Sequence, residues 1–273
     1  MEIRISDDFD LKKIVDSGQC FRPKEIEPNV FRFIVGEKIL HISSRGEDVF
    51  DVDCTVDDWE RVWKKYFDLD ANYASIRRDV ENFAANKPYE KILRDAVNFG
   101  AGIRILRQEP FETLISFIIS QRKNIPAIRT GVEGICKRFG RRVGDVYLFP
   151  RAEDMSGVTV DDLTGLGLAY RKDYIIDALE NVTGGFLELL ENFPDAELIE
   201  RLKTIRGVGD KVANCVALFA YHRVDRAPVD VWIKRAIDED FGGKNIFDSF
   251  GKNAGILQQY IFYHKRTKNA ARR

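Results

Sequence analysis

Hydrophobic residues have the spacing of β-strands in the first fifth of the chain. Three segments, 30–35, 38–42 and 48–52, either alternate apolar and polar residues or run apolar over several positions. Gly36 and Glu37 form a two-residue turn between the first two segments, which is typical of a hairpin. The pattern predicts an antiparallel β-sheet near the amino terminus.

The hydrophobic period becomes helical after Asp57. Trp59, Val62, Trp63 and Phe67 share one face of a helix. A second stripe of the same period is formed by Phe111, Leu114, Ile115, Ile118 and Ile119. Glycine and proline residues then divide the remaining chain into helices, with breaks near positions 144, 165–167, 184–185, 193–194 and 242–243.

These patterns predict an α+β protein in two parts. Residues 1–95 would form an amino-terminal antiparallel β-sheet domain with flanking helices. Residues 96–273 would form a helical region with a cleft between its layers. A chain of 273 residues with 44% hydrophobic content can bury a substantial core.

Charge is divided unevenly between the two parts. The net charge of −1 combines −5 in residues 1–95 with +4 in residues 96–273. An excess of positive charge in the helical region suits a surface that binds phosphates. No apolar run reaches the roughly 20 residues of a membrane span, and the amino terminus lacks the pattern of a signal peptide. We therefore expect a soluble intracellular protein, in the cytoplasm or nucleoid.

The four cysteines exclude two kinds of metal site. Cys20, Cys54, Cys136 and Cys215 are too far apart in the sequence for a zinc site or a four-cysteine iron–sulfur motif. Disulfides are not expected inside the cell. We expect neither a metal nor a cofactor.

A glycine hairpin is the most informative local motif. Gly207 and Gly209 flank Val208, so the backbone can take positive φ, turn tightly and leave its amides free for an anion. The apolar pattern that follows predicts a helix, whose amino-terminal dipole also favours a phosphate. The resulting helix-hairpin-helix would span about residues 198–222. The span lacks the glycines and the hydroxyl residue of a nucleotide-binding loop, so ATP binding is not expected.

Two residues close to the hairpin are candidates for chemistry. Lys211 lies in the first turn of the predicted helix, where the helix dipole disfavours the protonated amine. A neutral lysine can attack an electrophilic sugar carbon and form a Schiff base. Asp230 follows Pro228 and Val229 and is expected to cap the next helix while it stays ionised. Taken alone, Lys211 also fits a solvated helix lysine, and Asp230 a simple cap.

Several segments together resemble a known family. Residues 207–215, followed by 228–231, look like the helix-hairpin-helix DNA glycosylases, and within them the eukaryotic-type branch of the 8-oxoguanine DNA glycosylases, here in a prokaryotic member. Similar segments occur in the family's order at 17–22, 104–112, 116–120, 166–171 and 255–262. One departure is Pro23, where the family usually has tryptophan.

The resemblance implies a bifunctional glycosylase and lyase acting on 8-oxoguanine in duplex DNA. Lys211 would displace the damaged base and leave an imine that undergoes β-elimination, while ionised Asp230 would stabilise the developing oxocarbenium ion. The target nucleotide must first be flipped out of the duplex. The carbonyl of Gly18 would accept the hydrogen that 8-oxoguanine carries on N7 and guanine lacks. Phe262 would stack on the base, Gln258 would read its Watson–Crick edge, and Cys215 would pack on its other face.

The resemblance also implies how the rest of the DNA is held. The hairpin of Gly207, Val208 and Gly209 would bind a phosphate, and its carbonyls are a possible site for a monovalent cation when DNA is bound. Tyr170 would be wedged beside the estranged base, with Arg171 facing the opposite cytosine. Arg122, Lys123 and Asn124 would contact DNA near the hole that the flipped base leaves. The protein is expected to act as a monomer.

Three positions depart from the eukaryotic members. Arg122 stands in place of an asparagine that fills the hole in the duplex, and Ala127 in place of an arginine that helps to read the opposite cytosine. An alanine side chain donates no hydrogen bond, so we expect a weaker preference for cytosine opposite the lesion. Trp232 replaces a histidine seen near the aspartate in some relatives.

Two other functions remain open at this point. An alkylation-repair glycosylase of the same superfamily would excise methylated purines with an aspartate and water, without a lysine nucleophile. A non-enzymatic helix-hairpin-helix module would bind DNA without needing Lys211, Asp230 and the Gly18 segment together.

Overall fold

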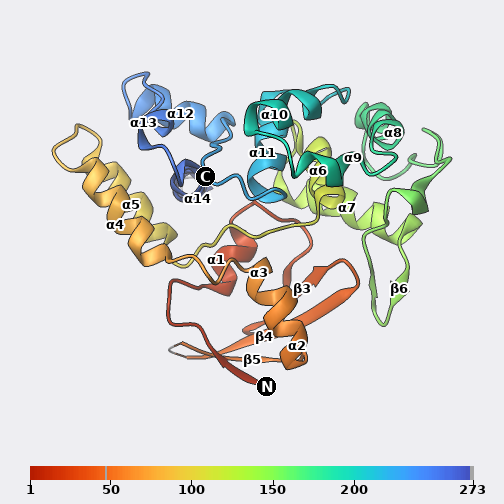
Figure 1. The fold of residues 1–273 in the computed structure, drawn as a ribbon, viewed down its shortest axis with the longest axis horizontal. Coiled ribbons are helices and arrows are strands. Elements are labelled where there is room, and N and C mark those ends of the chain that lie inside the picture. The colour runs from red at the N-terminus through yellow and green to blue at the C-terminus, as the bar shows by residue number, and fades with distance from the viewer. Residues whose placement is uncertain (47, 271–273) are drawn as a thin grey trace.

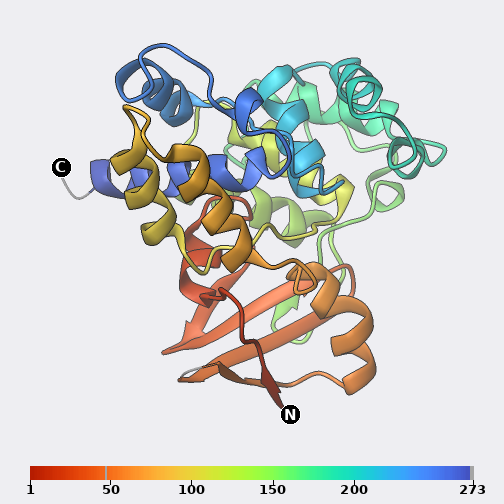
Figure 2. The same cartoon turned by 60° about the vertical axis from the view of Figure 1, so that its left-hand side comes forward.

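The computed structural model describes residues 1–46 and 48–270 and has a sheet layer beneath a larger helical layer. In Figures 1 and 2 the sheet lies at the bottom with the amino terminus, and the helices cover it from above. This arrangement confirms the predicted α+β class. Among the described residues, no helix has both the length and the apolar character needed to cross a membrane.

The sheet has five antiparallel strands in the order β1-β5-β4-β3-β2. The bounds are β1 Glu2–Arg4, β2 Lys24–Glu27, β3 Val30–Val35, β4 Lys38–Gly46 and β5 Val49–Val52. Val35 pairs with Lys38 across the predicted turn. The three predicted strands are confirmed, but β1 and β2 were not predicted, because β1 has only three residues and all four residues of β2 are exposed.

One face of the sheet packs on a short helical segment. It consists of α2 Val56–Asp58, the π-helical turn η1 Trp59–Trp63, and α3 Lys64–Tyr66. The predicted stripe therefore does not lie on one continuous α-helix. Its residues Trp59, Trp63 and Phe67 are nevertheless buried in one core with Phe33 and Leu40, as the pattern requires. A π-turn shifts the side chains that follow it, which is how the stripe keeps its contact with the sheet.

The remaining described elements are helices and one hairpin. The helices are α1 Leu11–Asp16, α4 Tyr73–Ala84, α5 Glu90–Gly100, α6 Pro110–Ser120, α7 Ile125–Phe139, η2 Glu153–Met155, α8 Arg171–Asn181, α9 Phe186–Leu190, α10 Asp195–Lys203, α11 Asp210–Phe219, α12 Val231–Glu239, α13 Phe247–Phe250 and α14 Ala254–Ala270. A two-stranded hairpin, β6 Arg142–Val143 and β7 Val146–Tyr147, turns at Gly144. The expectation of an all-helical region was therefore wrong at this hairpin, whose strands are too short to show a period.

Side chains before and after the start of α4 belong mainly to different hydrophobic cores. Side chains of α4 and α5, such as Tyr73, Val80 and Leu93, belong to the large core of the helical layer. A separate core packs on the sheet and includes Ile14, Phe33 and Trp63. The predicted domain boundary stays a prediction, and residues 271–273 of its second part lie outside the described chain.

Candidate active site

The glycine hairpin joins α10 to α11, as predicted. Gly207 has a φ of +83°, and a β-carbon added there would overlap the ring of Tyr174. Gly209 differs from the expectation, because its φ is −94° and it is the N-cap residue of α11. Only Gly207 therefore requires glycine on grounds of conformation and space.

The amides of the hairpin are partly free. Among the described residues, no acceptor is found for the amides of Gly207 and Gly209, whereas Val208 donates to the carbonyl of Ile205 at 3.0 Å. The side chain of Val208 is buried in the core, so this residue can reach a ligand only through its backbone. The carbonyl of Gly207 accepts a hydrogen bond from Gln121 at 3.1 Å.

Lys211 lies in the first turn of α11 and points toward the end of α6. Its Nζ donates to the hydroxyl of Ser120 at 3.2 Å and lies 5.1 Å from the centre of the Phe117 ring. The side chain is partly buried. The amine is thus held by a neutral hydroxyl and an aromatic ring, and no carboxylate in the described chain forms an ion pair with it.

Asp230 is the N-cap of α12, which confirms the predicted cap. Its Oδ1 accepts from the amides of Trp232 at 3.0 Å and Ile233 at 2.9 Å. Burial raises the pKa of this carboxyl, and the two amides and the charge of Lys211 act against that rise. Oδ2 takes no hydrogen bond from a described residue, so one oxygen holds the helix and the other is available to a ligand.

Cys215 follows Lys211 by one helical turn on α11 and is buried. Burial raises the pKa of its thiol to about 11, with Lys211 lowering it and Asp230 raising it. The thiol is therefore neutral at physiological pH. Both charged residues act on the same sulfur, which places Lys211, Asp230 and Cys215 around one site.

Gly18 and Phe262 meet although they are 244 positions apart in the sequence. Gly18 has a φ of +84°, and a β-carbon there would lie 3.0 Å from Cε1 of Phe262 and 2.7 Å from Nη1 of Arg266. The 17–22 segment and α14 are tied together by Gln259, which donates to the carbonyl of Ser17 at 2.8 Å. Gly18 is thus held against the carboxyl-terminal helix.

Gln258 lies on α14 one turn before Phe262. Its side chain is buried, and its Oε1 has no hydrogen-bond partner among the described residues. A buried polar atom without a partner is costly unless a ligand completes it. The orphaned oxygen is consistent with the predicted role of Gln258 in reading a base.

The turn between α6 and α7 carries three of the predicted DNA contacts. Arg122 is exposed and has a φ of +52°, which is unusual for a residue other than glycine. Lys123 donates from Nζ to the carbonyl of Gly167 at 2.5 Å. The exposed Asn124 caps α7 by accepting from the amide of Ala127 at 2.9 Å.

Tyr170 and Arg171 lie at the start of α8 and differ in exposure. Tyr170 is 44% exposed, which suits the predicted wedge. Arg171 is buried, with its guanidinium carbon 4.5 Å from the centre of the Tyr170 ring and donor groups directed at the carbonyls of Gln121 and Leu168. This guanidinium faces the protein interior, so its contact with an opposite cytosine stays a prediction.

Comparison with known proteins identifies the family. Residues 2–114 match the family described as the N-terminal domain of 8-oxoguanine DNA glycosylase. The solved structure of MBOgg1 with a low-affinity DNA ligand is 33% identical, with a TM-score of 0.91, over 98% of this chain and 96% of the other. A Clostridium acetobutylicum 8-oxoguanine glycosylase/lyase, solved with double-stranded DNA carrying cytosine opposite the lesion, is 32% identical over 98% of both chains, with a TM-score of 0.89. The chain belongs to the 8-oxoguanine DNA glycosylases.

A yeast relative agrees with this family. The N-glycosylase/DNA lyase of Saccharomyces cerevisiae is 34% identical over 195 residues, which are 65% of this chain and 50% of the yeast protein. The chain thus spans about half of that relative's length. The predicted resemblance of the chain to the 8-oxoguanine DNA glycosylases is confirmed.

Three residues at the site were not given a role from the sequence. Ser120 holds Lys211, Gln259 ties α14 to the Gly18 segment, and Arg266 lies against Gly18 and Phe262. Ser120 falls within a segment that resembles the family, so its position could have been noticed. No local pattern reveals Arg266, because its neighbour Gly18 is at the other end of the chain.

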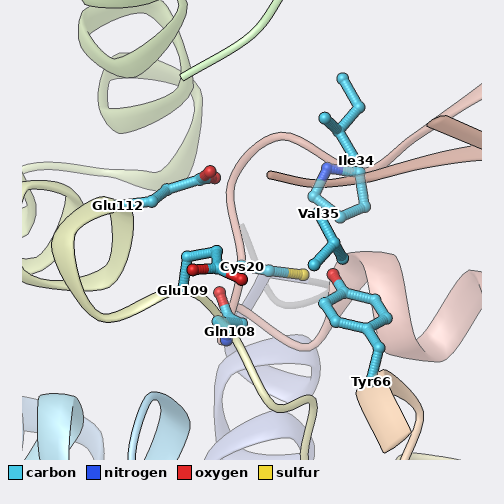
Figure 3. A pocket seen from close by; sticks show the side chains of 8 residues that line it. Cys20, Ile34, Val35, Tyr66, Gln108, Glu109 and Glu112 are labelled. Atoms are coloured by element: carbon cyan, nitrogen blue, oxygen red, sulfur yellow. The ribbon is translucent and has the colours of Figure 1, made fainter. Parts of the chain in front are cut away.

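A small cavity lies beside the 17–22 segment, between the sheet and α6. Figure 3 shows it between Cys20, Tyr66 and Glu112. Its volume of about 10 Å³ is enough for about one water molecule. Among the described residues, no cluster of three or more histidine, cysteine or acidic side chains is able to hold a metal ion.

Proposed function

We propose that this protein is a bifunctional DNA glycosylase and lyase that excises 8-oxoguanine from duplex DNA through a Schiff base on Lys211. The proposal is supported by the nearness of Lys211 and Asp230, whose charges both act on Cys215, and by the contact between Gly18 and Phe262. The charge of Asp230 raises the pKa of Arg266, and Arg266 lies against Gly18. Arg266 thus links Lys211, Asp230 and Cys215 to Gly18 and Phe262.

The chemistry requires an amine, a fixed negative charge and a pocket. The neutral amine of Lys211 attacks C1′ of the flipped nucleotide, and the electrons of the N-glycosidic bond leave with the base. Asp230 stabilises the positive charge that develops on the sugar. The amine then loses a proton and the sugar ring opens to an imine. Removal of a proton from C2′ expels the 3′ phosphate and nicks the strand.

The pocket and the loops support a role on DNA. The free amides of Gly207 and Gly209 suit one backbone phosphate. Gln258 presents an unpaired buried oxygen for the edge of a base, and exposed Tyr170 is placed to fill the duplex. Two similar structures were solved with DNA ligands, one of them containing 8-oxoguanine opposite cytosine.

The proposed reaction also bears on assembly, location and cofactors. Both the nucleophile and the base pocket come from one chain, so a monomer is sufficient for the reaction. A substrate in chromosomal DNA implies an intracellular location at the nucleoid. No cofactor is needed, because Lys211 is the nucleophile. A monovalent cation at the hairpin would share the carbonyls of Ile205 and Gly207, each of which already accepts one hydrogen bond and has a second lone pair.

Borohydride trapping tests the proposal directly. Reduction during reaction with an 8-oxoguanine duplex should give a covalent protein–DNA adduct with the wild type and none with Lys211→Gln. Lys91→Gln, which alters an exposed lysine on α5, is the matched control and should trap like the wild type. Excision of 3-methyladenine without any adduct would favour the alkylation-repair alternative. Binding of duplex DNA without excision of either base would favour a non-enzymatic module.

A further inference from the structure

Arg266 occupies a special place on α14. It follows Phe262 by one helical turn, and its guanidinium carbon lies 5.2 Å from the centre of the Phe262 ring. One nitrogen, Nη2, donates to the carbonyl of Asp16, just before the Gly18 segment. The guanidinium is thereby fixed in the space between α14 and that segment.

The other terminal nitrogen of Arg266 is buried and unused. Nη1 has no acceptor among the described residues. It lies 2.7 Å from the position that a β-carbon on Gly18 would take. A charged donor that is buried without a partner is costly, so its retention at this place calls for an acceptor that arrives with the ligand.

The charges around Arg266 do not supply that acceptor. Burial lowers the pKa of the guanidinium, and the fields of Tyr263, Asp16 and Asp230 raise it while that of Arg129 lowers it further. None of the side chains of these residues accepts a hydrogen bond from Nη1. The nitrogen therefore lies beside Gly18 with no acceptor for its hydrogens among the described residues.

8-Oxoguanine offers an acceptor that guanine lacks. The lesion differs from guanine at two neighbouring atoms, a hydrogen on N7 and an oxygen on C8. If the carbonyl of Gly18 accepts from N7, the O8 atom lies on the same edge of the base, next to Gly18. That is the side on which Nη1 of Arg266 is placed.

We propose that Arg266 is a specificity-determining residue that donates a hydrogen bond from Nη1 to O8 of the flipped base. The inference rests on the proposed function and deepens it, because the lesion is then read at both of its altered atoms. Gly18 detects the added hydrogen and Arg266 detects the added oxygen. A guanine in the pocket would leave both protein groups unpaired.

Single-turnover excision of 8-oxoguanine, compared with cleavage of a duplex that already has an abasic site, tests this role. Arg266→Met keeps an unbranched side chain over Phe262 and removes the donor. We expect base excision to fall at least tenfold, while cleavage and trapping at the abasic site stay within about threefold of wild type. The control Lys268→Met removes an exposed positive charge from the same helix and should change neither rate.

Binding measurements locate the lost interaction. Duplexes with a 2′-fluoro nucleotide resist excision, because fluorine disfavours positive charge on the sugar, so Kd can be measured for 8-oxoguanine and for guanine. The ratio of the two constants should fall at least fivefold in Arg266→Met. An unchanged ratio with equal losses on both duplexes would show that Arg266 binds a phosphate or supports the fold, and would overturn the proposal.

A conservative variant covers the case in which Arg266→Met does not fold. Arg266→Lys keeps the charge, but its single nitrogen cannot reach both Asp16 and the base. It should lose excision activity and retain cleavage at the abasic site; excision at the wild-type rate would contradict a role for Nη1. If the wild type forms no adduct with the abasic duplex, the proposed function is contradicted. The ratio of Kd values for the 8-oxoguanine and guanine duplexes still tests the role of Arg266 in base recognition.

Discussion

The two sides of the candidate site differ in how their polar atoms are used. On the side of the base pocket, the Oε1 atom of Gln258 and the Nη1 atom of Arg266 are buried and have no partner among the described residues. On the side of the opposite strand, the terminal nitrogens of Lys123 and Arg171 donate to backbone carbonyls of Gly167, Gln121 and Leu168, and the Nε atom of Arg171 is buried without a described partner. The pocket side thus leaves its polar atoms to a ligand, whereas the other side uses most of its donors within the protein.

This difference indicates how each side meets DNA. The pocket is pre-organised, because Gln259 and Arg266 already hold α14 against the Gly18 segment. The opposite-strand side must give up contacts of Lys123 or Arg171 before those side chains reach a base. Burial and the nearby charge of Arg171 also lower the pKa of Lys123. Selectivity is therefore expected to lie mainly in the pocket.

Asp230→Asn should have the largest effect on the pocket side. Asparagine caps a helix about as well as aspartate, so the melting temperature should stay within about 2 °C of wild type. Loss of the fixed charge should lower the single-turnover excision rate about 10²- to 10³-fold. Excision assays and thermal unfolding of the same preparation separate the two roles. A threefold or smaller loss of rate would show that Asp230 is only a helix cap.

Gly207→Ala should have an intermediate effect, at the phosphate site between the two sides. The φ of +83° and the overlap with Tyr174 both disfavour a side chain, so the free energy of unfolding should fall by about 1–3 kcal/mol. The affinity for an undamaged duplex should fall with it. Gly209→Ala is the matched control for stability, because its φ is −94° and an added β-carbon meets no atom within 4 Å. Equal stability of the two variants would contradict this account of the hairpin.

The opposite-strand side should show a smaller effect, of a few fold. Because Ala127 donates no hydrogen bond from its side chain, excision rates with cytosine, adenine, guanine or thymine opposite the lesion should agree within about tenfold. Ala127→Arg should raise the preference for cytosine about threefold or more by adding a donor. A strong cytosine requirement in the wild type would show that Arg171 or Arg122 is released to read the base.

The sequence predicts periodic elements and local motifs well, and contacts between distant segments poorly. Strands β3 to β5, the helix that begins at Asp210 and the cap at Asp230 follow from local spacing and residue type. Strands β1 and β2 lack an apolar pattern, and their pairing is set by the rest of the sheet. The family resemblance named Gly18 and Phe262 together. Arg266 escaped notice because its importance depends on a neighbour 248 positions away.

A final and smaller effect concerns Glu112, which contacts Arg22 at the end of the 17–22 segment. Glu112 lies beside the cavity of Figure 3, with an oxygen 3.9 Å from Nη1 of Arg22, the residue that ends the 17–22 segment. Burial raises the pKa of Glu112 from 4.5 to about 7, and the charge of Arg22 lowers it only in part. The folded protein therefore holds this proton more tightly than the unfolded chain does. The associated stability is fully present below about pH 4.5 and is lost as the pH rises through about 7.

Glu112→Gln should remove this pH dependence and so test how rigidly the pocket is held. Relative to the wild type, the free energy of unfolding of Glu112→Gln should rise by about 2 kcal/mol between pH 5 and pH 8. Urea unfolding at both pH values measures this difference. The exposed Glu153→Gln provides the control and should keep the wild-type slope. If the glutamine variant also excises 8-oxoguanine at an unchanged rate at pH 8, the pocket keeps its shape without this carboxylate, because Arg22 retains its ion pair with Glu133 at 3.1 Å. If the pH slope is unchanged, Glu112 is ionised throughout and the pocket rests on a complete ion pair.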